Sequence, residues 1–330
     1  MTLSNEELKQ IYFGAYSFKE TKDGYLQAFQ YTGKQQEYFR RTEAYWYDRC
    51  TASNGKTIEM ITAATEFSFD YKIIWQGSLD GFEIFADGEF VADKRIQDLP
   101  AEGSIQFSLN QEAERERKNT LQDLPKRRII IYLPVDATVL IRNFSLNASY
   151  EIPKKKEKVL WMGDSITQGY GPLRPSGTYV NVANRILDYD IINQGIGGYI
   201  YDVGSVTEMA GYKPDKIIIA LGTNQFESES FKPVEDFYER LFSVYGASVP
   251  KAVITPVWRC DLRSFREENT FGGFCEKIKN YCEKLENTIV INGFDLIPAD
   301  PEYYIDGLHP NEAGAKVYGE NLAEELRKRF

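Results

Sequence analysis

The pattern of apolar and polar residues divides the chain into two parts that follow different periods. Up to about residue 150, apolar and polar positions alternate one by one in short segments, which is typical of strands with one buried face. From Val159 onward, apolar runs of strand length alternate with longer segments of helical period. The charged stretch Pro153–Lys158 lies between the two parts and suits a solvated linker better than a phosphate-binding patch. We therefore predict two domains, over residues 1–153 and 154–330.

The first domain is predicted to be an all-β sandwich or jelly roll, because short strands follow one another with turn signals between them. The predicted segments are 65–71, a hairpin over 81–91, 103–109, 128–134 and 137–146. Asp87-Gly88 forms the hairpin turn, since glycine tolerates a positive φ. The alternating Phe67, Phe69 and Tyr71 suit a buried core better than an exposed sugar-binding face. The charged residues 111–126 are expected to form a solvated loop or a short helix.

The second domain is predicted to be a parallel α/β sheet with helices on both faces. The predicted strands are 159–163, 190–193, 216–221, 251–256 and 288–292, and the predicted helices are 179–187, 234–245, 271–285 and 310–329. Pro310 is expected in the first turn of the last helix, where its missing N–H is not needed. Proteins of this class build their sites at the carboxyl edge of the sheet.

Composition narrows the function. A net charge of -10 over 330 residues argues against a nucleic-acid partner, and no apolar stretch approaches the length of a membrane span. The polar, acidic N-terminus does not resemble a signal peptide, so a cytoplasmic location and free thiols at the four cysteines are expected. The chain has a single histidine, His309, which excludes a multi-histidine metal site. We expect no metal and no cofactor.

The candidate chemistry starts at Ser165, which directly follows the apolar strand 159–163. A serine nucleophile needs a base, a group that orients the base, and donors for the oxyanion. His309 is the only imidazole in the chain, and Asp306 precedes it by three residues on a turn that enters a helix. Asp306 could also act only as a helix cap or loop carboxylate. The spacing nevertheless favours Ser165, His309 and Asp306 as nucleophile, base and orienting acid.

Two further strand ends offer oxyanion donors. The glycine cluster Gly195–Gly198 allows backbone N–H groups to approach a substrate closely, although such a cluster could also bind phosphate. The full dinucleotide fingerprint is absent there. Asn224 ends the strand 216–221 and can donate from its amide, or it could simply form an Asx-turn. A third strand end carries Trp258 and Arg259, which could line a substrate pocket or serve only packing.

Taken together, Gly163-Asp164-Ser165, the glycine cluster, Gly222-Thr223-Asn224 and Asp306-x-x-His309 resemble the motifs of the SGNH (GDSL) hydrolases, in the same order. The resemblance implies a flavodoxin-like fold with a five-stranded parallel sheet. It also implies an oxyanion hole made by the Ser165 and Gly198 N–H groups and the Asn224 side chain. Gln225 departs from the aspartate that many members carry there. The front half is similar to the N-terminal jelly roll of SGNH esterases that include carbohydrate esterase family two.

These observations predict a metal-independent serine esterase that hydrolyses short acyl esters, acetyl esters foremost, of small molecules or carbohydrates through an acyl-serine. Two alternatives remain open: an acyltransferase that uses the same acyl-enzyme, and a non-catalytic carbohydrate-binding protein. The α/β-hydrolase fold is disfavoured, because its nucleophile elbow needs glycine at position 167, which is threonine here.

Overall fold

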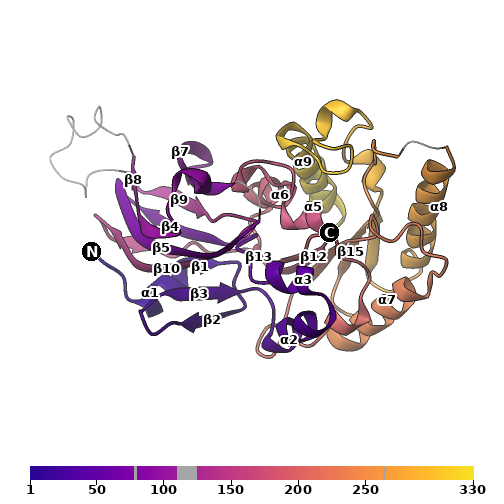
Figure 1. Ribbon diagram of the computed structural model, residues 1–330, viewed down its shortest axis with the longest axis horizontal. Coiled ribbons are helices and arrows are strands. Elements are labelled where there is room, and N and C mark those ends of the chain that lie inside the picture. The colour runs from indigo at the N-terminus through magenta and orange to yellow at the C-terminus, as the bar shows by residue number, and fades with distance from the viewer. Residues whose placement is uncertain (78–79, 110–124, 263–264) are drawn as a thin grey trace.

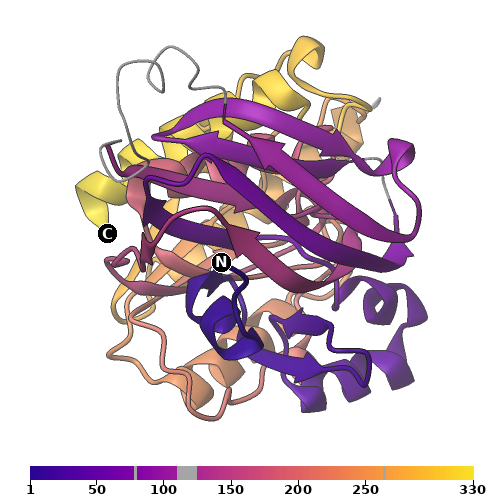
Figure 2. The same ribbon diagram turned by 90° about the vertical axis from the view of Figure 1, so that its left-hand side faces the viewer.

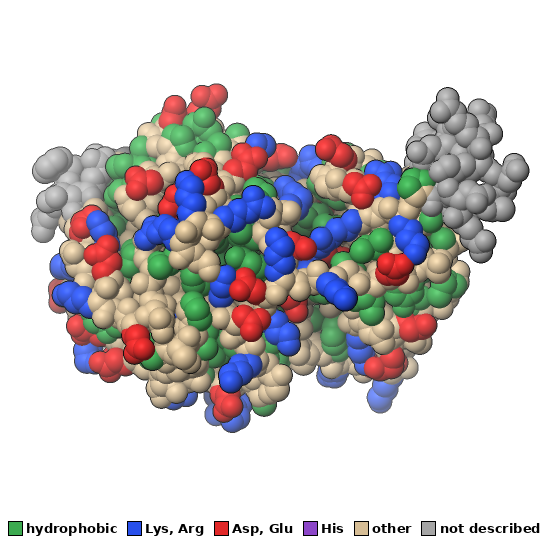
Figure 3. Space-filling model, turned by 180° about the vertical axis from the view of Figure 1, so that it is seen from behind, with side chains coloured by type: hydrophobic (Ala, Val, Ile, Leu, Met, Phe, Trp, Pro, Cys, Tyr) green, Lys and Arg blue, Asp and Glu red, His purple; other side chains and the backbone are tan. Residues whose placement is uncertain are grey.

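The computed structural model describes residues 1–77, 80–109, 125–262 and 265–330, with a β-rich half and an α/β half lying side by side (Figure 1). Acidic and basic side chains intermingle on the face seen from behind, so neither sign of charge dominates it (Figure 3). The stretch 111–126, predicted as a loop or short helix, lies almost entirely outside the described residues.

Two antiparallel sheets make up the β-rich half, which confirms the predicted sandwich (Figure 2). One sheet has the order β1-β4-β9-β6-β7, with β11 paired to β4. Its strands are β1 (Tyr12–Phe13), β4 (Thr57–Thr62), β6 (Gly81–Ala86), β7 (Glu89–Arg95), β9 (Arg127–Tyr132) and β11 (Tyr150–Glu151). The other sheet has the order β2-β3-β10-β5-β8. Its strands are β2 (Ser17–Glu20), β3 (Leu26–Phe29), β5 (Glu66–Gln76), β8 (Glu102–Ser108) and β10 (Ala137–Leu146).

The turn and the buried aromatic residues that the sequence predicted in this half are present in the structure. Asp87 and Gly88 have φ values of 52° and 86°, the two positive values that a tight hairpin turn between β6 and β7 requires. Phe67, Phe69 and Tyr71 are each 1% exposed and belong to the core between the two sheets. The prediction that these rings fill a core is therefore confirmed.

The α/β half contains one parallel sheet of five strands in the order β13-β12-β14-β15-β16. The strands are β12 (Lys158–Gly163), β13 (Asp190–Gly195), β14 (Lys216–Ala220), β15 (Lys251–Ile254) and β16 (Thr288–Ile291). Helices α6 (Tyr179–Leu187) and α9 (Glu312–Arg329) share a core with one face, and α7 (Lys232–Tyr245) and α8 (Phe265–Cys282) share a core with the other. This is the flavodoxin-like order, whose ligand crevice lies where the strand order reverses, between β12 and β14.

Three helices in the first 50 residues were not predicted from the sequence: α1 (Asn5–Ile11), α2 (Gly33–Thr42) and α3 (Ala44–Arg49). Tyr31, Phe39 and Cys50, in and beside α2 and α3, are buried in the same core as β12 and α7, not between the two antiparallel sheets. The α2–α3 segment therefore leaves the sandwich and completes one face of the α/β half. No helix among the described residues combines the length and apolarity that a membrane crossing would need.

Pro310 is not in the first turn of α9, contrary to the prediction. The helix begins at Glu312, and its N-cap is Asn311, whose side chain accepts a hydrogen bond from the Gly314 N–H. Pro310 instead pairs with Tyr304 in an isolated β-bridge. An asparagine cap satisfies an N–H of the first turn, so the helix starts two residues later than the proline suggested.

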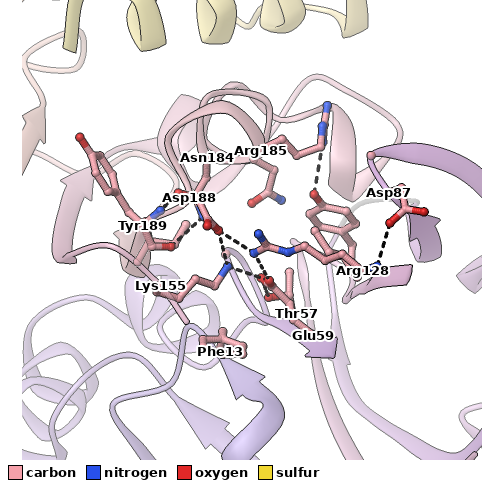
Figure 4. Close-up of a pocket in the computed structure, with 16 residues that line it drawn as sticks. Phe13, Thr57, Glu59, Asp87, Arg128, Lys155, Asn184, Arg185, Asp188 and Tyr189 are labelled. Carbon is pink, nitrogen blue, oxygen red and sulfur yellow. Dashed lines mark hydrogen bonds and ion pairs between the residues drawn. The ribbon is translucent and has the colours of Figure 1, made fainter. Parts of the chain in front are cut away.

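The linker prediction for Pro153–Lys158 is also wrong at Lys155. Its side chain is only 7% exposed and forms ion pairs with Glu59 at 2.7 Å and Asp188 at 3.4 Å. Arg128 contacts the same two carboxylates at 2.8 and 2.6 Å (Figure 4). Because Glu59 and Arg128 belong to the sandwich and Asp188 ends α6, this four-residue network joins the two halves. A charged stretch can be buried when each charge meets an opposite one.

Candidate active site

The turn between β12 and the short helix α5 (Ser165–Gln168) positions Ser165 at the carboxyl edge of the sheet. A side chain at Gly163 would collide with Thr167 and with the carbonyl of Ala220, so the tight turn requires glycine. Asp164 caps α5 by accepting a hydrogen bond from the Ile166 N–H at 3.0 Å. Burial raises the pKa of the Asp164 carboxyl to about 7.

Ser165, His309 and Asp306 form one chain of hydrogen bonds. Ser165 Oγ lies 2.8 Å from His309 Nε2, and His309 Nδ1 lies 2.7 Å from Asp306 Oδ2. With the ring proton on Nδ1 donated to the carboxylate, Nε2 is left to accept the serine proton. The structure thus brings together all three side chains that the sequence nominated.

Asp306 uses its two oxygens for different purposes. Oδ2 meets the imidazole, while Oδ1 accepts the backbone N–H groups of Leu308 at 3.0 Å and His309 at 2.8 Å. Burial alone would raise the pKa of Asp306, but these hydrogen bonds outweigh it and hold the pKa below its ordinary value. The carboxylate therefore shapes the turn and orients the ring at once, so the capping and orienting roles do not compete.

The turn itself depends on Gly307. Its φ is +84°, and a Cβ there would lie 2.6 Å from the Asp261 backbone nitrogen. On the other side of the imidazole, the Tyr170 ring makes an edge-on contact with His309, with centroids 4.6 Å apart. The ring position is thus fixed by Asp306 and by packing against Tyr170.

Gly198 and Asn224 line the same cavity as Ser165, with a volume of about 490 Å³. Gly198 is exposed and has a φ of +69°, which glycine adopts without strain. The Asn224 amide donates to the Tyr199 carbonyl at 2.9 Å, which ties it to the glycine loop, and its second N–H remains for a ligand. The structure therefore places the predicted donor groups around one space beside Ser165.

A second layer holds the glycine loop in place. The Gly197 N–H donates to Gln168 Oε1 at 2.7 Å, and Gln168 Nε2 donates to Asp136 Oδ1 at 2.6 Å. Gln168 comes from α5, while Asp136 belongs to the sandwich. One relay thus links the helix that begins at Ser165, the glycine loop and the N-terminal half.

The sandwich half also supplies part of the cavity wall. Tyr45 and Arg49 of α3, Gly77 and Asp136 all line the cavity. A Cβ on Gly197 would lie 3.1 Å from the Tyr45 hydroxyl, so α3 packs closely over the glycine loop. Sequence reasoning missed these residues, because α3 carries no catalytic motif and reaches the site only through the tertiary fold.

Trp258 and Arg259 do not line this cavity, so of their two predicted roles, pocket lining and packing, the contacts favour packing. Trp258 stacks on Phe294 with ring centroids 4.1 Å apart and donates to the Phe294 carbonyl at 3.1 Å. The Arg259 guanidinium donates hydrogen bonds to the Asp261 carboxylate, at 3.0 and 2.6 Å, and to the Thr223 carbonyl at 2.9 Å. Both residues serve packing, and Arg259 holds the residue that precedes Asn224.

Among the described residues, no group of three or more histidine, cysteine, aspartate or glutamate side chains is arranged to hold a metal ion. The four cysteines are free thiols, and Cys260 is less buried than the other three.

The α/β half matches a known family over residues 161–317, the GDSL-like Lipase/Acylhydrolase family. No curated protein sequence matches the chain significantly. Solved structures share the fold across both halves at low sequence identity. The salicylyl-acyltransferase SsfX3 from a tetracycline biosynthetic pathway has 16% identity and a TM-score of 0.71, with 96% of this chain and 94% of that one covered.

Two other structures cover most of both chains. A candidate GDSL-like lipase from Bacteroides ovatus has 19% identity and a TM-score of 0.73, covering 99% of this chain and 97% of its own. A family two carbohydrate esterase from Clostridium thermocellum, in complex with cellohexaose, has 17% identity and a TM-score of 0.61, covering 84% and 93%. The α/β half, which carries the Ser165 turn and the His309 turn, is thus the part of the chain that matches the GDSL-like Lipase/Acylhydrolase family.

Proposed function

We propose that the protein is a serine esterase that removes short acyl groups, acetyl foremost, from a polar alcohol such as a carbohydrate. The observation that carries this proposal is the hydrogen-bonded chain from Ser165 through His309 to Asp306, open to a cavity beside Gly198 and Asn224.

In this mechanism, Ser165 Oγ attacks the ester carbonyl while His309 Nε2 takes its proton. The negative oxygen of the tetrahedral intermediate accepts hydrogen bonds from the Ser165 and Gly198 N–H groups and from the Asn224 amide. His309 then protonates the leaving alcohol, which yields an acyl-serine. Water, deprotonated by His309, attacks the acyl-serine and releases the carboxylic acid and the free serine.

The lining of the cavity supports a short acyl group and a polar alcohol. Leu308 is the only aliphatic side chain among its described lining residues; the others are aromatic, polar, charged or glycine. A long acyl chain needs an apolar groove for burial, since each buried CH₂ contributes about 0.8 kcal/mol. The carbohydrate part of the proposal draws on the family two esterases, one of which holds cellohexaose.

An acyltransferase is the second candidate, because the acyl-serine can pass to an alcohol in place of water. The salicylyl-acyltransferase shares both halves of the fold, although the likeness concerns the fold alone. Gly198, Asn224 and Tyr170 in the cavity wall are exposed, so water can reach the cavity, which favours hydrolysis. The ratio of transfer to hydrolysis, measured with added sugar alcohols as acceptors, separates the two.

Ser165→Ala tests the proposal. We expect kcat on 4-nitrophenyl acetate and on acetylated sugars to fall at least about 10⁴-fold, because the acyl-enzyme cannot form. Ser149→Ala, which removes an exposed hydroxyl in the sandwich half that does not line the cavity, is the matched control and should keep full activity. Circular dichroism checks that both variants fold. Full activity in folded Ser165→Ala, or no labelling of wild-type Ser165 by a serine-reactive phosphonate, would refute the esterase and point to a binding protein.

A further inference from the structure

We infer that Arg49 makes the cavity selective for esters that carry a carboxylate near the scissile bond. This inference rests on the proposed esterase function and names a class of substrate for it. Arg49 is the last residue of α3 and lines the cavity together with Ser165 and Gly198. A Cβ on Gly197 would lie 3.3 Å from Arg49 Cδ, so the arginine stem rests on the glycine loop beside the nucleophile.

Aromatic stacking holds the guanidinium in place. Its Cζ lies 3.5 Å from the centroid of the Tyr45 ring and 5.2 Å from that of Trp75. Nη1 donates to the Tyr45 carbonyl at 3.3 Å. Stacking on ring faces restricts the plane of the guanidinium and leaves N–H groups at its edge for an acceptor. Less conformational freedom is then lost when a ligand binds.

Arg49 has no carboxylate partner within ion-pair distance in the part of the chain that the structure describes. Two other arginines at the junction of the two halves do have one: Arg128 contacts Glu59, and Arg174 contacts Glu83. Arg259, close to Asn224, is engaged with Asp261. A cation that is held in a concave site without a counter-ion is suited to an anion that arrives with the substrate.

Two carboxylates also lie in the cavity wall, but both are turned to the protein. Asp306 is bound to His309, as described. Asp136 is only 5% exposed, accepts a hydrogen bond from Gln168 and places its Oδ2 against Gly77, where a side chain would collide. Arg49 is the only lysine or arginine among the described cavity residues. Among these charged groups, Arg49 is therefore the one without an opposite charge in the described residues.

The planar fork of arginine matches the geometry of a carboxylate, with which it forms two parallel hydrogen bonds. Two kinds of ester would present one. The alcohol part can carry it, as in an acetylated uronic acid, or the acyl part can carry it, as in a succinyl ester. Both place an anion within a few bonds of the carbonyl that Ser165 attacks.

The test compares kcat/KM for matched pairs of substrates: acetylated methyl glucuronoside against acetylated methyl glucoside, and succinylated against acetylated methyl glucoside. We expect at least one anionic member to be preferred about tenfold by the wild type, since hydrogen bonds between two charged groups are stronger than those between neutral groups. The pair that shows the preference identifies which part of the ester carries the carboxylate. In Arg49→Gln the ratio should fall close to one, and Arg49→Lys should give an intermediate ratio.

Arg41→Gln is the matched control, because Arg41 is an exposed arginine on α2 that pairs with Glu37. It should leave the ratio unchanged. Equal rates for both members of each pair in the wild type, or an undiminished preference in Arg49→Gln, would overturn the inference. Hydrolysis of the neutral acetate by the wild type, abolished in Ser165→Ala, shows in the same experiment that the esterase itself stands.

Discussion

Two cavities lie between the halves of the molecule. In one, polar groups face open space, whereas in the other most charged groups are paired with one another. The active-site cavity lies at the carboxyl edge of the parallel sheet and collects groups that face open space: Ser165, Gly198, Asn224 and Arg49. The other cavity, of about 240 Å³, lies toward the amino ends of the strands, next to Asp188 and Tyr189, which precede β13.

In this second cavity, four of the charged side chains pair with one another, while Arg185 donates to the Ser176 carbonyl. Glu59, Arg128, Lys155 and Asp188 bind one another in the network that joins the two halves (Figure 4). A ligand would have to compete with those pairs. The enclosure of a cavity therefore says little about whether it binds a ligand. Polar groups that are held in place without a partner are the better indication of a functional site.

The comparison predicts the largest loss of stability at Glu59. Glu59→Gln removes the charge that both Arg128 and Lys155 contact, and it leaves two cations partly buried. We expect the free energy of unfolding in urea to fall by about 3 kcal/mol, while the kcat of the folded fraction stays unchanged. Glu151→Gln, which breaks an exposed pair with Lys126, is the control and should change stability little. A large fall in kcat for Glu59→Gln would mean that the second cavity takes part in the reaction.

Asn224→Ala should lower kcat and leave stability almost unchanged, the reverse of Glu59→Gln. Loss of the amide removes one oxyanion donor, so kcat on acetate esters should fall by about 10² to 10³-fold. KM and the unfolding midpoint should change little, because Asn224 is exposed. Steady-state kinetics with a neutral acetyl ester, together with a thermal melt, measure both. Normal kcat in the folded variant would remove Asn224 from the oxyanion hole.

Asp80 differs from the polar groups of both cavities. It is a buried carboxyl that contacts no opposite charge among the described residues. It is 2% exposed, its Oδ2 accepts the Val135 N–H at 2.5 Å, and its Oδ1 has no hydrogen-bond partner among the described residues. Burial raises the pKa of Asp80 to about 8, helped by the charge of Asp136. The side chain is thus protonated in the native state at neutral pH.

The direction of the pH effect follows from this pKa. Between the ordinary pKa near 4 and the native value, the folded protein holds a proton that the unfolded chain has lost, so stability falls as pH rises. Asp80→Asn cannot titrate. From pH 6 to pH 9, the wild type should therefore lose about 3 kcal/mol more unfolding free energy than the variant. Urea unfolding at several pH values measures the difference, and parallel curves for the two proteins would contradict the assignment.

The sequence predicted the elements whose signals are local. The alternation around Phe67 and Phe69, the Asp87-Gly88 turn and the five apolar runs of the parallel sheet all depend on neighbouring residues, and all appear in the structure. The proximity of Ser165 and His309 could also be predicted, because parallel strand ends meet at one edge of a sheet and the chain offers a single imidazole.

The residues whose roles the sequence did not predict make contacts with residues that are distant along the chain. Lys155 looked like a solvated residue because its partners, Glu59 and Asp188, are far away along the chain. Arg259 looked like a pocket residue because it follows a strand end, but Asp261 captures its guanidinium. Arg49 could not be nominated at all, since only the tertiary packing of α3 carries it to the cavity.

The α2–α3 segment has a consequence for how the chain folds. Tyr31 and Phe39 leave the ribosome well before Leu160, Ile217 and Val253, with which they share a core. The N-terminal half therefore cannot finish folding by itself during synthesis, because one of its segments waits for strands that have not yet been made. The wall of the cavity that carries Tyr45 and Arg49 is consequently completed only after the strands of the parallel sheet have been made.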